Sequence, residues 1–121
     1  MLTYFFDSYA LIEIVKGSEN YKRFQDSRII TTKLNLLEVH YILLRDVSKE
    51  IADRFLLEYY VALIDFNKQD IIQSNEFKLK YKDRNLSMTD CLGYILSKKL
   101  EIKFLTGDKE FKDLLNVEFM K

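Results

Sequence analysis

The chain has 121 residues, 48% of them apolar, and its 19 basic and 19 acidic side chains leave no formal net charge at pH 7. This composition favours a folded protein with a core over a disordered chain, and the length suits one domain spanning residues 1–121. The neutral balance argues against binding to nucleic acid through the overall field, although a local basic patch stays compatible with it.

The start of the chain and its cysteine content bear on where the protein works. Residues 1–10 lack the basic start and long apolar stretch of a signal peptide, and no apolar run approaches the ~20 residues that span a membrane. Cys91 is the single cysteine, which rules out an intrachain disulfide and is typical of a reducing compartment. We therefore expect a cytoplasmic protein that does not enter a membrane.

Short β-like runs alternate with helical ones, and no proline, repeat or low-complexity tract divides the sequence. Apolar runs and helical periodicity predict, in chain order, a strand at residues 2–6, helices at 8–15 and 19–25, a strand at 29–30, helices at 33–45 and 48–60, a strand at 61–66, helices at 69–82 and 87–98, a strand at 102–105, a helix at 109–115 and a strand at 117–119. This alternation is typical of βαβ units, so we expect an α/β fold with a parallel sheet between layers of helices.

Three acidic residues stand where such a fold would gather them. Asp7 follows the first predicted strand directly, and Asp108 follows the strand at 102–105 after a short link. Asp90 lies at the start of a predicted helix, and helix starts face the same edge of a βαβ sheet as the carboxyl ends of its strands. Ligands of open parallel sheets bind at that edge. The three carboxylates are therefore candidates for one site.

Each of these three acids also has a purely structural interpretation. Asp7 can cap the helix that begins at Ser8, and Asp108 can cap the helix that follows it. Ser87 and Asp90 have the spacing of a capping box, with Asp in place of the usual Glu or Gln. Glu38 has no such role, because it lies in the middle of a largely apolar helix. It is either paired, bound to metal, or on an exposed seam of that helix.

Other residues with chemical potential are less well placed. His40 is two positions from Glu38 and so faces away from it on a helix, and Cys91 has no nearby histidine and is best explained as a small packing residue. A basic run precedes Asp90 and is either a solvated surface or a contact for phosphates. Its members are Lys78, Lys80, Lys82 and Arg84.

The order and context of the four acids resemble the PIN-domain family, and within it the compact VapC-like toxin ribonucleases of prokaryotic toxin–antitoxin pairs. The matching segments are FFDSYALI around Asp7, NLLEVHYILL around Glu38, LSMTDCLGYIL around Asp90 and KFLTGDKEF around Asp108. The resemblance covers essentially the whole chain. It implies a three-layer α/β/α sandwich with a parallel sheet of about five strands.

The resemblance also implies a site. Asp7, Asp90 and Asp108 would hold Mg²⁺ or Mn²⁺, and Glu38 would be a further ligand or would position water. Thr106, two positions before the last acid, matches a Ser/Thr of the family pattern, and Ser8 is a further supporting residue. Two departures are mild: Gly93 stands where alanine is common, and Tyr9 is bulkier than the small or hydroxyl residue often found at its position.

Simple electrostatics supports a metal-assisted reaction. Two carboxylates ~4 Å apart repel by roughly 4 kcal/mol at an effective dielectric constant of about 20, so four in one pocket need a cation or bound protons. A bound cation can activate water and neutralise charge on a phosphodiester. The resemblance therefore predicts a metal-dependent endoribonuclease that leaves a 5′-phosphate, with RNA as substrate.

The partners follow from the resemblance and from one helix. VapC-like toxins are commonly homodimers, and a small antitoxin protein wraps them and can place a basic side chain among the acids. The helix at 48–60 has more apolar surface than one core-facing stripe requires, which favours an interface. Its apolar residues are Ile51, Ala52, Phe55, Leu56, Leu57, Tyr59 and Tyr60.

Two other functions remain open from the sequence. The first is a non-catalytic module that binds RNA or protein and uses its acids as caps or to hold a basic partner. The second is phosphoryl transfer with Asp7 as nucleophile, a chemistry that usually needs a second acid two residues later, where this chain has Tyr9. Metal-dependent stability would argue against the first.

Overall fold

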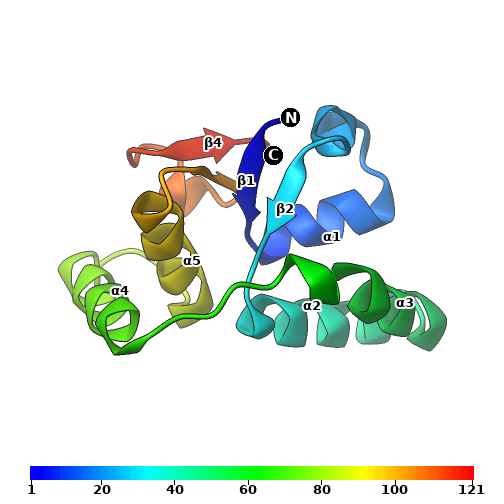
Figure 1. Ribbon diagram of the computed structural model, residues 1–121, viewed down its shortest axis with the longest axis horizontal. Helices are drawn as coiled ribbons and strands as arrows, with labels where there is room; N and C mark the ends of the chain where they lie inside the picture. The colour runs from blue at the N-terminus through cyan, green and yellow to red at the C-terminus, as the bar shows by residue number, and fades with distance from the viewer.

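The computed structural model describes residues 1–121 and shows a parallel sheet between two layers of helices (Figure 1). The α/β sandwich expected from the sequence is confirmed. The strands are β1 (Thr3–Phe6), β2 (Arg28–Ile30), β3 (Lys103–Thr106) and β4 (Val117–Phe119). The α-helices are α1 (Ser8–Lys16), α2 (Lys33–Asp46), α3 (Lys49–Tyr59), α4 (Lys68–Lys80) and α5 (Met88–Lys99). Three short 3₁₀ helices complete the chain: η1 (Glu19–Phe24), η2 (Tyr60–Ala62) and η3 (Lys109–Phe111).

The strand order creates a ligand-binding edge. The sheet runs β2-β1-β3-β4 with all neighbours parallel, so the carboxyl ends of its strands lie at one edge. Phe5 of β1 pairs with Ile30 of β2 on one side and with Phe104 of β3 on the other. The chain moves outward in opposite directions from β1 and from β3, so the order reverses between these two strands. Open α/β sheets bind ligands at such a reversal.

Both faces of β1 are buried, which explains its continuous apolar run. Tyr4 and Phe6 belong to one core cluster with residues of α1, α2 and α3, whereas Phe5 belongs to a second cluster with residues of α5. Leu105 and Phe104 of β3 divide between the same two clusters. Figure 1 shows α1 and α5 on opposite sides of the sheet. The period-two alternation of β1 and β3 thus builds the three layers.

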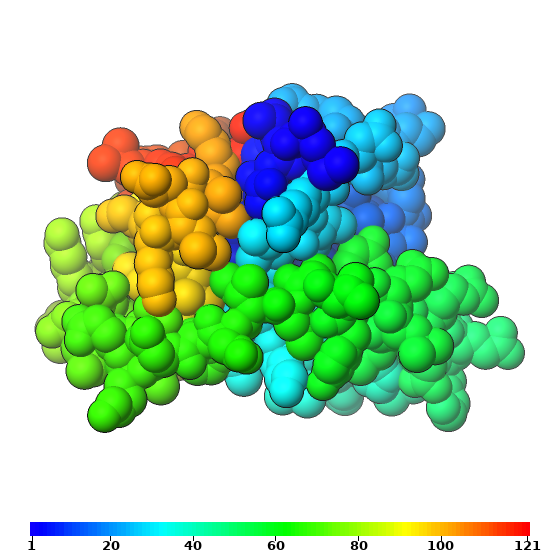
Figure 2. All heavy atoms as spheres, in the orientation of Figure 1, coloured from blue at the N-terminus to red at the C-terminus, as the bar shows by residue number.

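The expectation of about five strands is approximate, because the segment at 61–66 does not form a full strand. The 3₁₀ helix η2 takes up its first residues, and Leu63 alone forms a parallel bridge, to Thr31. Two backbone hydrogen bonds join the segments, from Thr31 N to Ala62 O (3.0 Å) and from Ile64 N to Thr31 O (3.0 Å). The segment that links α3 to α4 then runs over the surface (Figure 2). Val61 in this segment is 91% exposed.

The prediction of a helix at 109–115 is wrong beyond the first turn. Only η3 forms, and the chain turns back at Asn116, which adopts a left-handed conformation with φ of 66°. The Asn116 side-chain amide donates to Ile102 O (2.7 Å), and this bond fixes the turn into β4. Likewise, the helix expected at 19–25 is the 3₁₀ helix η1. Tertiary contacts override the helical pattern in both short segments.

Candidate active site

Asp7 is the first residue after β1 and the N-cap of α1. Its Oδ1 accepts a hydrogen bond from Ala10 N (2.8 Å), as the capping interpretation predicts. Its backbone N–H donates to Leu105 O (3.2 Å), so the continuing β1–β3 ladder fixes the position of its backbone. The residue is only 1% exposed. One carboxylate oxygen therefore serves the cap while the other makes no bond to a protein backbone group.

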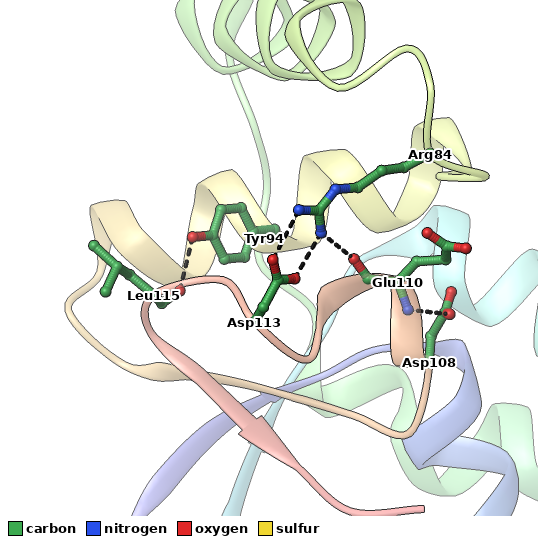
Figure 3. A network of polar contacts seen from close by, with 6 residues as sticks. All are labelled: Arg84, Tyr94, Asp108, Glu110, Asp113 and Leu115. Carbon is green, nitrogen blue, oxygen red and sulfur yellow. Dashed lines mark hydrogen bonds and ion pairs between the residues drawn. The ribbon is translucent and has the colours of Figure 1, made fainter.

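Asp108 follows β3 in a turn that several hydrogen bonds hold. Thr106 Oγ1 accepts from Asp108 N (3.0 Å), and Asp108 Oδ1 accepts from Glu110 N (3.0 Å) to cap η3 (Figure 3). From the turn after α4, Arg84 donates to Glu110 O (2.7 Å) and forms a bidentate pair with Asp113. This network fixes the segment that follows Asp108.

Asp90 lies in the first turn of α5 and is only half of the expected capping box. Ser87 Oγ accepts from Asp90 N (3.0 Å), but the Asp90 carboxylate does not return a bond to the Ser87 backbone. A complete capping box does form elsewhere, between Asn67 and Asp70 at the start of α4. The Asp90 carboxylate is therefore available to the site.

Glu38 on α2 is partly exposed, and a chain of hydrogen bonds orients it. The Thr32 hydroxyl donates to Asn35 Oδ1 (2.7 Å), Asn35 Nδ2 donates to Ser8 Oγ (3.1 Å), and Ser8 Oγ donates to Glu38 Oε1 (2.7 Å). Thr32 and Asn35 are fully buried. The chain couples the start of α2 to the start of α1 and ends on the carboxylate. The sequence interpretation missed Thr32 and Asn35, although a polar residue three positions before Glu38 on an apolar helix was a usable signal.

The structure brings all four acids to one pocket of about 570 Å³ at the carboxyl edge of β1 and β3. They come from four different segments of the chain, the ends of β1 and β3 and the helices α2 and α5. The residues that line the pocket are Asp7, Ser8, Tyr9, Glu38, Tyr41, Ile42, Ser87, Asp90, Gly107, Asp108, Lys109 and Lys121.

The carboxylates in this pocket repel one another. Burial raises the pKa of Asp7 well above its usual range, and the charges of Asp90 and then Asp108 raise it further, against the hydrogen bonds from Thr106 and Ala10. Burial likewise raises the pKa of Asp90 to about 6, against a hydrogen bond with the Ser87 side chain and with added repulsion from Glu38 and Asp108. None of the four acids forms an ion pair with a basic side chain.

The donor set suits a hard divalent cation. Four carboxylates supply oxygen ligands of the type that Mg²⁺ and Mn²⁺ prefer, and the raised pKa values of Asp7 and Asp90 indicate missing positive charge. No group of three His, Cys, Asp or Glu side chains is yet arranged closely enough to hold a metal ion. An ion would draw the carboxylates together, because only one oxygen each of Asp7 and Asp108 caps a helix and the Asp90 carboxylate makes no bond to a backbone group. The residues fit such an ion by their chemistry.

Tyr9 and Gly107 explain one departure from the family pattern. A Cβ on Gly107 would lie 2.1 Å from Cε1 of Tyr9, so the ring lies against the backbone of the turn before Asp108. The large side chain is accommodated because residue 107 has no side chain. The ring also packs at 6.3 Å from that of Tyr21.

The other candidate residues have structural roles. His40 Nε2 lies 2.9 Å from Asp53 Oδ1 and does not line the pocket of acids. Cys91 is fully buried, and burial raises the pKa of its thiol to about 11, as befits a packing residue. In the basic run, Lys78 donates to Leu86 O and Arg84 is engaged with the segment after η3. These two side chains are therefore used within the fold.

Comparison with known proteins agrees with this geometry. The PIN domain family matches residues 4–115, and the chain belongs to this family. The structure is similar to Mycobacterium tuberculosis VapC20, a sarcin-ricin loop cleaving toxin, with a TM-score of 0.79 at 16% identity over 98% of this chain and 99% of that one.

Two further solved structures share the fold. VapBC2 from Rickettsia felis, bound to a DNA fragment from its promoter, has a TM-score of 0.72 at 18% identity, over 99% of this chain and 100% of that one. A toxin–antitoxin complex from Klebsiella pneumoniae has a TM-score of 0.72 at 19% identity, over 94% of both chains. No curated protein matches the sequence. None of the helices is long and apolar enough to cross a membrane.

Proposed function

We propose that this protein is a metal-dependent endoribonuclease and the toxin of a toxin–antitoxin pair. The observation that carries the proposal is the pocket in which a PIN-family chain brings together Asp7, Glu38, Asp90 and Asp108 without a basic partner for any of them. Such a pocket attracts a divalent cation, and a cation among carboxylates is suited to the hydrolysis of phosphodiesters.

The residues would have different roles in metal binding and catalysis. Asp7, Asp90 and Asp108 would hold Mg²⁺ or Mn²⁺, which when bound activates water and neutralises charge on the phosphodiester. Glu38, oriented by Ser8, would hold the ion or orient the attacking water. Thr106 would keep the backbone of Asp108 in place through its hydrogen bond (3.0 Å).

The toxin role draws on relatives of the same fold. The similar structures include a toxin and toxin–antitoxin complexes. By analogy we propose a cytoplasmic homodimer that a small antitoxin protein inhibits by placing an arginine or lysine in the pocket. Such a basic group would supply the positive charge that the carboxylates lack, so inhibitor and metal would compete.

A non-catalytic binding module is the second candidate, because Asp7 and Asp108 both serve as caps (Asp7 Oδ1 to Ala10 N, 2.8 Å; Asp108 Oδ1 to Glu110 N, 3.0 Å). In that case the four acids would contribute to folding alone. Variants with Asn in place of Asp, or Gln in place of Glu38, would then keep the function.

Near-isosteric substitutions distinguish the two candidates. Asp7→Asn removes a charge while Asn remains a good N-cap for α1. Asp90→Asn removes a charge while the backbone N–H of residue 90 can still donate to the N-cap Ser87, so both variants should fold. Loss of one metal ligand should lower the rate of RNA cleavage in Mg²⁺ by about 10²-fold or more. Glu38→Gln and Asp108→Asn should behave similarly.

The matched control is Asp65→Asn, which removes the same charge from an exposed residue that forms no ion pair. It should cleave RNA at the parent rate. Purified Asp90→Asn protein that cut RNA as fast as the parent would refute the proposed site.

A further inference from the structure

Two lysines share the pocket with the four acids, and they are the only basic residues that line it. Lys109 follows Asp108 directly and begins η3, whereas Lys121 follows β4. Both are exposed, and neither forms an ion pair with any carboxylate. They are therefore free to contact a ligand of opposite charge at the mouth of the pocket.

Lys121 owes its position to contacts with distant parts of the chain. Met120 N donates to Thr106 O (2.9 Å), which extends the pairing of β4 along β3 to the edge where the acids lie. The hydroxyl of the buried Tyr21 donates to Met120 O, and Asn20 Nδ2 donates to Lys121 O (3.0 Å). Strand pairing and η1 together hold the segment after β4 beside the pocket.

An RNA strand entering this pocket needs cationic contacts besides a metal ion. Its phosphates are repelled by four carboxylates, and the neutral net charge supplies no general attraction. The nearby basic run does not fill this role, because none of its four members lines the pocket, and Lys78 and Arg84 are bonded within the fold. A lysine ammonium on a flexible stem suits a phosphate contact.

We propose that Lys109 and Lys121 bind phosphates of the RNA strand at the mouth of the pocket of acids, and that Tyr21 is the positioning residue for Lys121. The inference rests on the proposed function and adds a backbone-binding element to it. It assigns the segment after β4 a role in substrate binding.

RNA binding without cleavage gives the direct test. The background is the double variant Asp7→Asn/Asp90→Asn in EDTA, which lowers the repulsion and prevents cleavage. The probe is a short fluorescein-labelled single-stranded RNA, whose anisotropy is followed across a KCl titration. Each lost phosphate contact lowers the slope of log affinity against log salt by about 0.7, which is roughly fivefold in affinity at ~0.1 M salt. Lys121→Gln and Lys109→Gln should each show this loss.

The matched control is Lys103→Gln. Lys103 is exposed at the opposite end of β3, so this variant changes the net charge equally at a site away from the pocket. It should keep the affinity and the salt slope of the background. An equal loss in Lys103→Gln would mean that only overall charge matters, which would overturn the proposal.

Tyr21→Phe tests the positioning role. It removes one hydroxyl and keeps the ring that packs against Phe24 at 5.6 Å. The affinity for RNA should fall by part of the Lys121→Gln effect, and Tyr21→Phe/Lys121→Gln should bind no more weakly than Lys121→Gln alone. Additive losses would instead indicate general loosening of the fold and would refute the positioning role.

Failure of the lysine contacts and failure of the proposed function give different results in the binding experiment. If the background binds RNA but Lys121→Gln and Lys109→Gln leave affinity and slope unchanged, the lysine contacts are wrong and the proposed function stands. If the background and the parent protein both bind no RNA, the proposed function fails and this inference fails with it.

Discussion

Asp7 has two opposite effects on the stability of the fold, one from its capping hydrogen bond and one from its buried charge. One of its oxygens caps α1 through Ala10 N (2.8 Å), which is worth about 1 kcal/mol in typical helices. Its burial among other carboxylates, however, raises its pKa well above the usual range, so the ionised form is costly. Burial also raises the pKa of Asp90, and the hydrogen bond with the Ser87 side chain offsets only part of this effect. The pocket therefore holds charge that the folded protein alone does not compensate.

The stability of the protein in metal-free buffer should depend on pH, because the ionised form of Asp90 is unfavourable in the folded state. Burial raises the pKa of Asp90 from 3.8 to about 6, so between these values the folded state binds more protons than the unfolded state. The stabilising contribution of the protonated form is complete below that window and is lost as the pH rises through about 6. Asp90→Asn should therefore be more stable than the parent at neutral pH, by at most roughly 3 kcal/mol.

The measurement is thermal unfolding in EDTA across the acidic to neutral range. The stability difference between Asp90→Asn and the parent should grow with pH, while Asp65→Asn should show no such trend. A variant less stable than the parent at neutral pH would mean that the Asp90 carboxylate is already compensated in the folded protein.

That the four acids gather in one pocket could be predicted from their order and context, but the residues that hold them in place could not. The capping roles of Asp7 and Asp108 follow from local spacing and were foreseen as alternatives. The hydrogen bond from Ser8 to Glu38 (2.7 Å) depends on how α1 packs against α2, across 30 residues of sequence. The place of Lys121 beside the pocket depends on pairing along β3, which no local pattern indicates.

At the scale of elements, α5 is held unusually close to the sheet. A Cβ on Gly93 would lie 2.6 Å from Cε1 of Phe5 and 3.1 Å from Cε1 of Phe104, and both rings are fully buried. The departure from alanine at this position has a physical reason, because aromatic residues on β1 and β3 fill the space below it. The close approach also sets the depth at which α5 presents Asp90.

Gly93→Ala should therefore destabilise the protein, even though alanine favours an α-helix by about 1 kcal/mol over glycine. The overpacked methyl group should lower the free energy of unfolding by about 1–3 kcal/mol, measured by urea denaturation. Phe5→Leu/Gly93→Ala should recover part of the loss, since the smaller side chain makes room. Full stability of Gly93→Ala alone would show that α5 can move outward freely.

The predictions of secondary structure were wrong in short segments whose conformation is determined by tertiary contacts. The apolar run at 61–66 has the composition of a strand, but Leu63 alone reaches a partner, because the chain leaves α3 through η2. The pattern at 109–115 is helical, yet the bidentate pair of Arg84 with Asp113 (2.7 and 2.9 Å; Figure 3) ends the helix early. The left-handed conformation of Asn116 then turns the chain into β4. Long helices and buried strands depend less on such contacts and were predicted correctly.

For the molecule as a whole, a divalent ion should supply the charge that the pocket lacks. Mn²⁺ or Mg²⁺ at 100 times its Kd stabilises a protein by ~2.7 kcal/mol, which corresponds to about 10 °C in Tm for a chain of this size. Asp90→Asn should largely abolish this shift, and Asp65→Asn should retain it. A calorimetric scan without any shift at millimolar metal would exclude the metal site.

The apolar surface around α3 leads to the prediction for assembly. Ala52 and Phe55 of this helix are buried in the core, but Leu57 is 81% exposed and Tyr60 is 53% exposed. Leu56, Leu57 and Tyr60 line a cavity of about 530 Å³ on the outer side of α2 and α3. Apolar side chains grouped on the surface of a small protein usually mark an interface. We therefore expect a homodimer that buries this part of α3.

Light scattering at micromolar concentration should give the mass of a dimer for the parent protein. Leu57→Asp should give a monomer with an unchanged Tm at low concentration, because the side chain contributes little to the core and a buried charge at the interface is costly. Leu79→Asp is the matched control, since Leu79 is 70% exposed on α4, away from this surface. A monomeric parent would refute the dimer, and a dimeric Leu57→Asp would move the interface to another face.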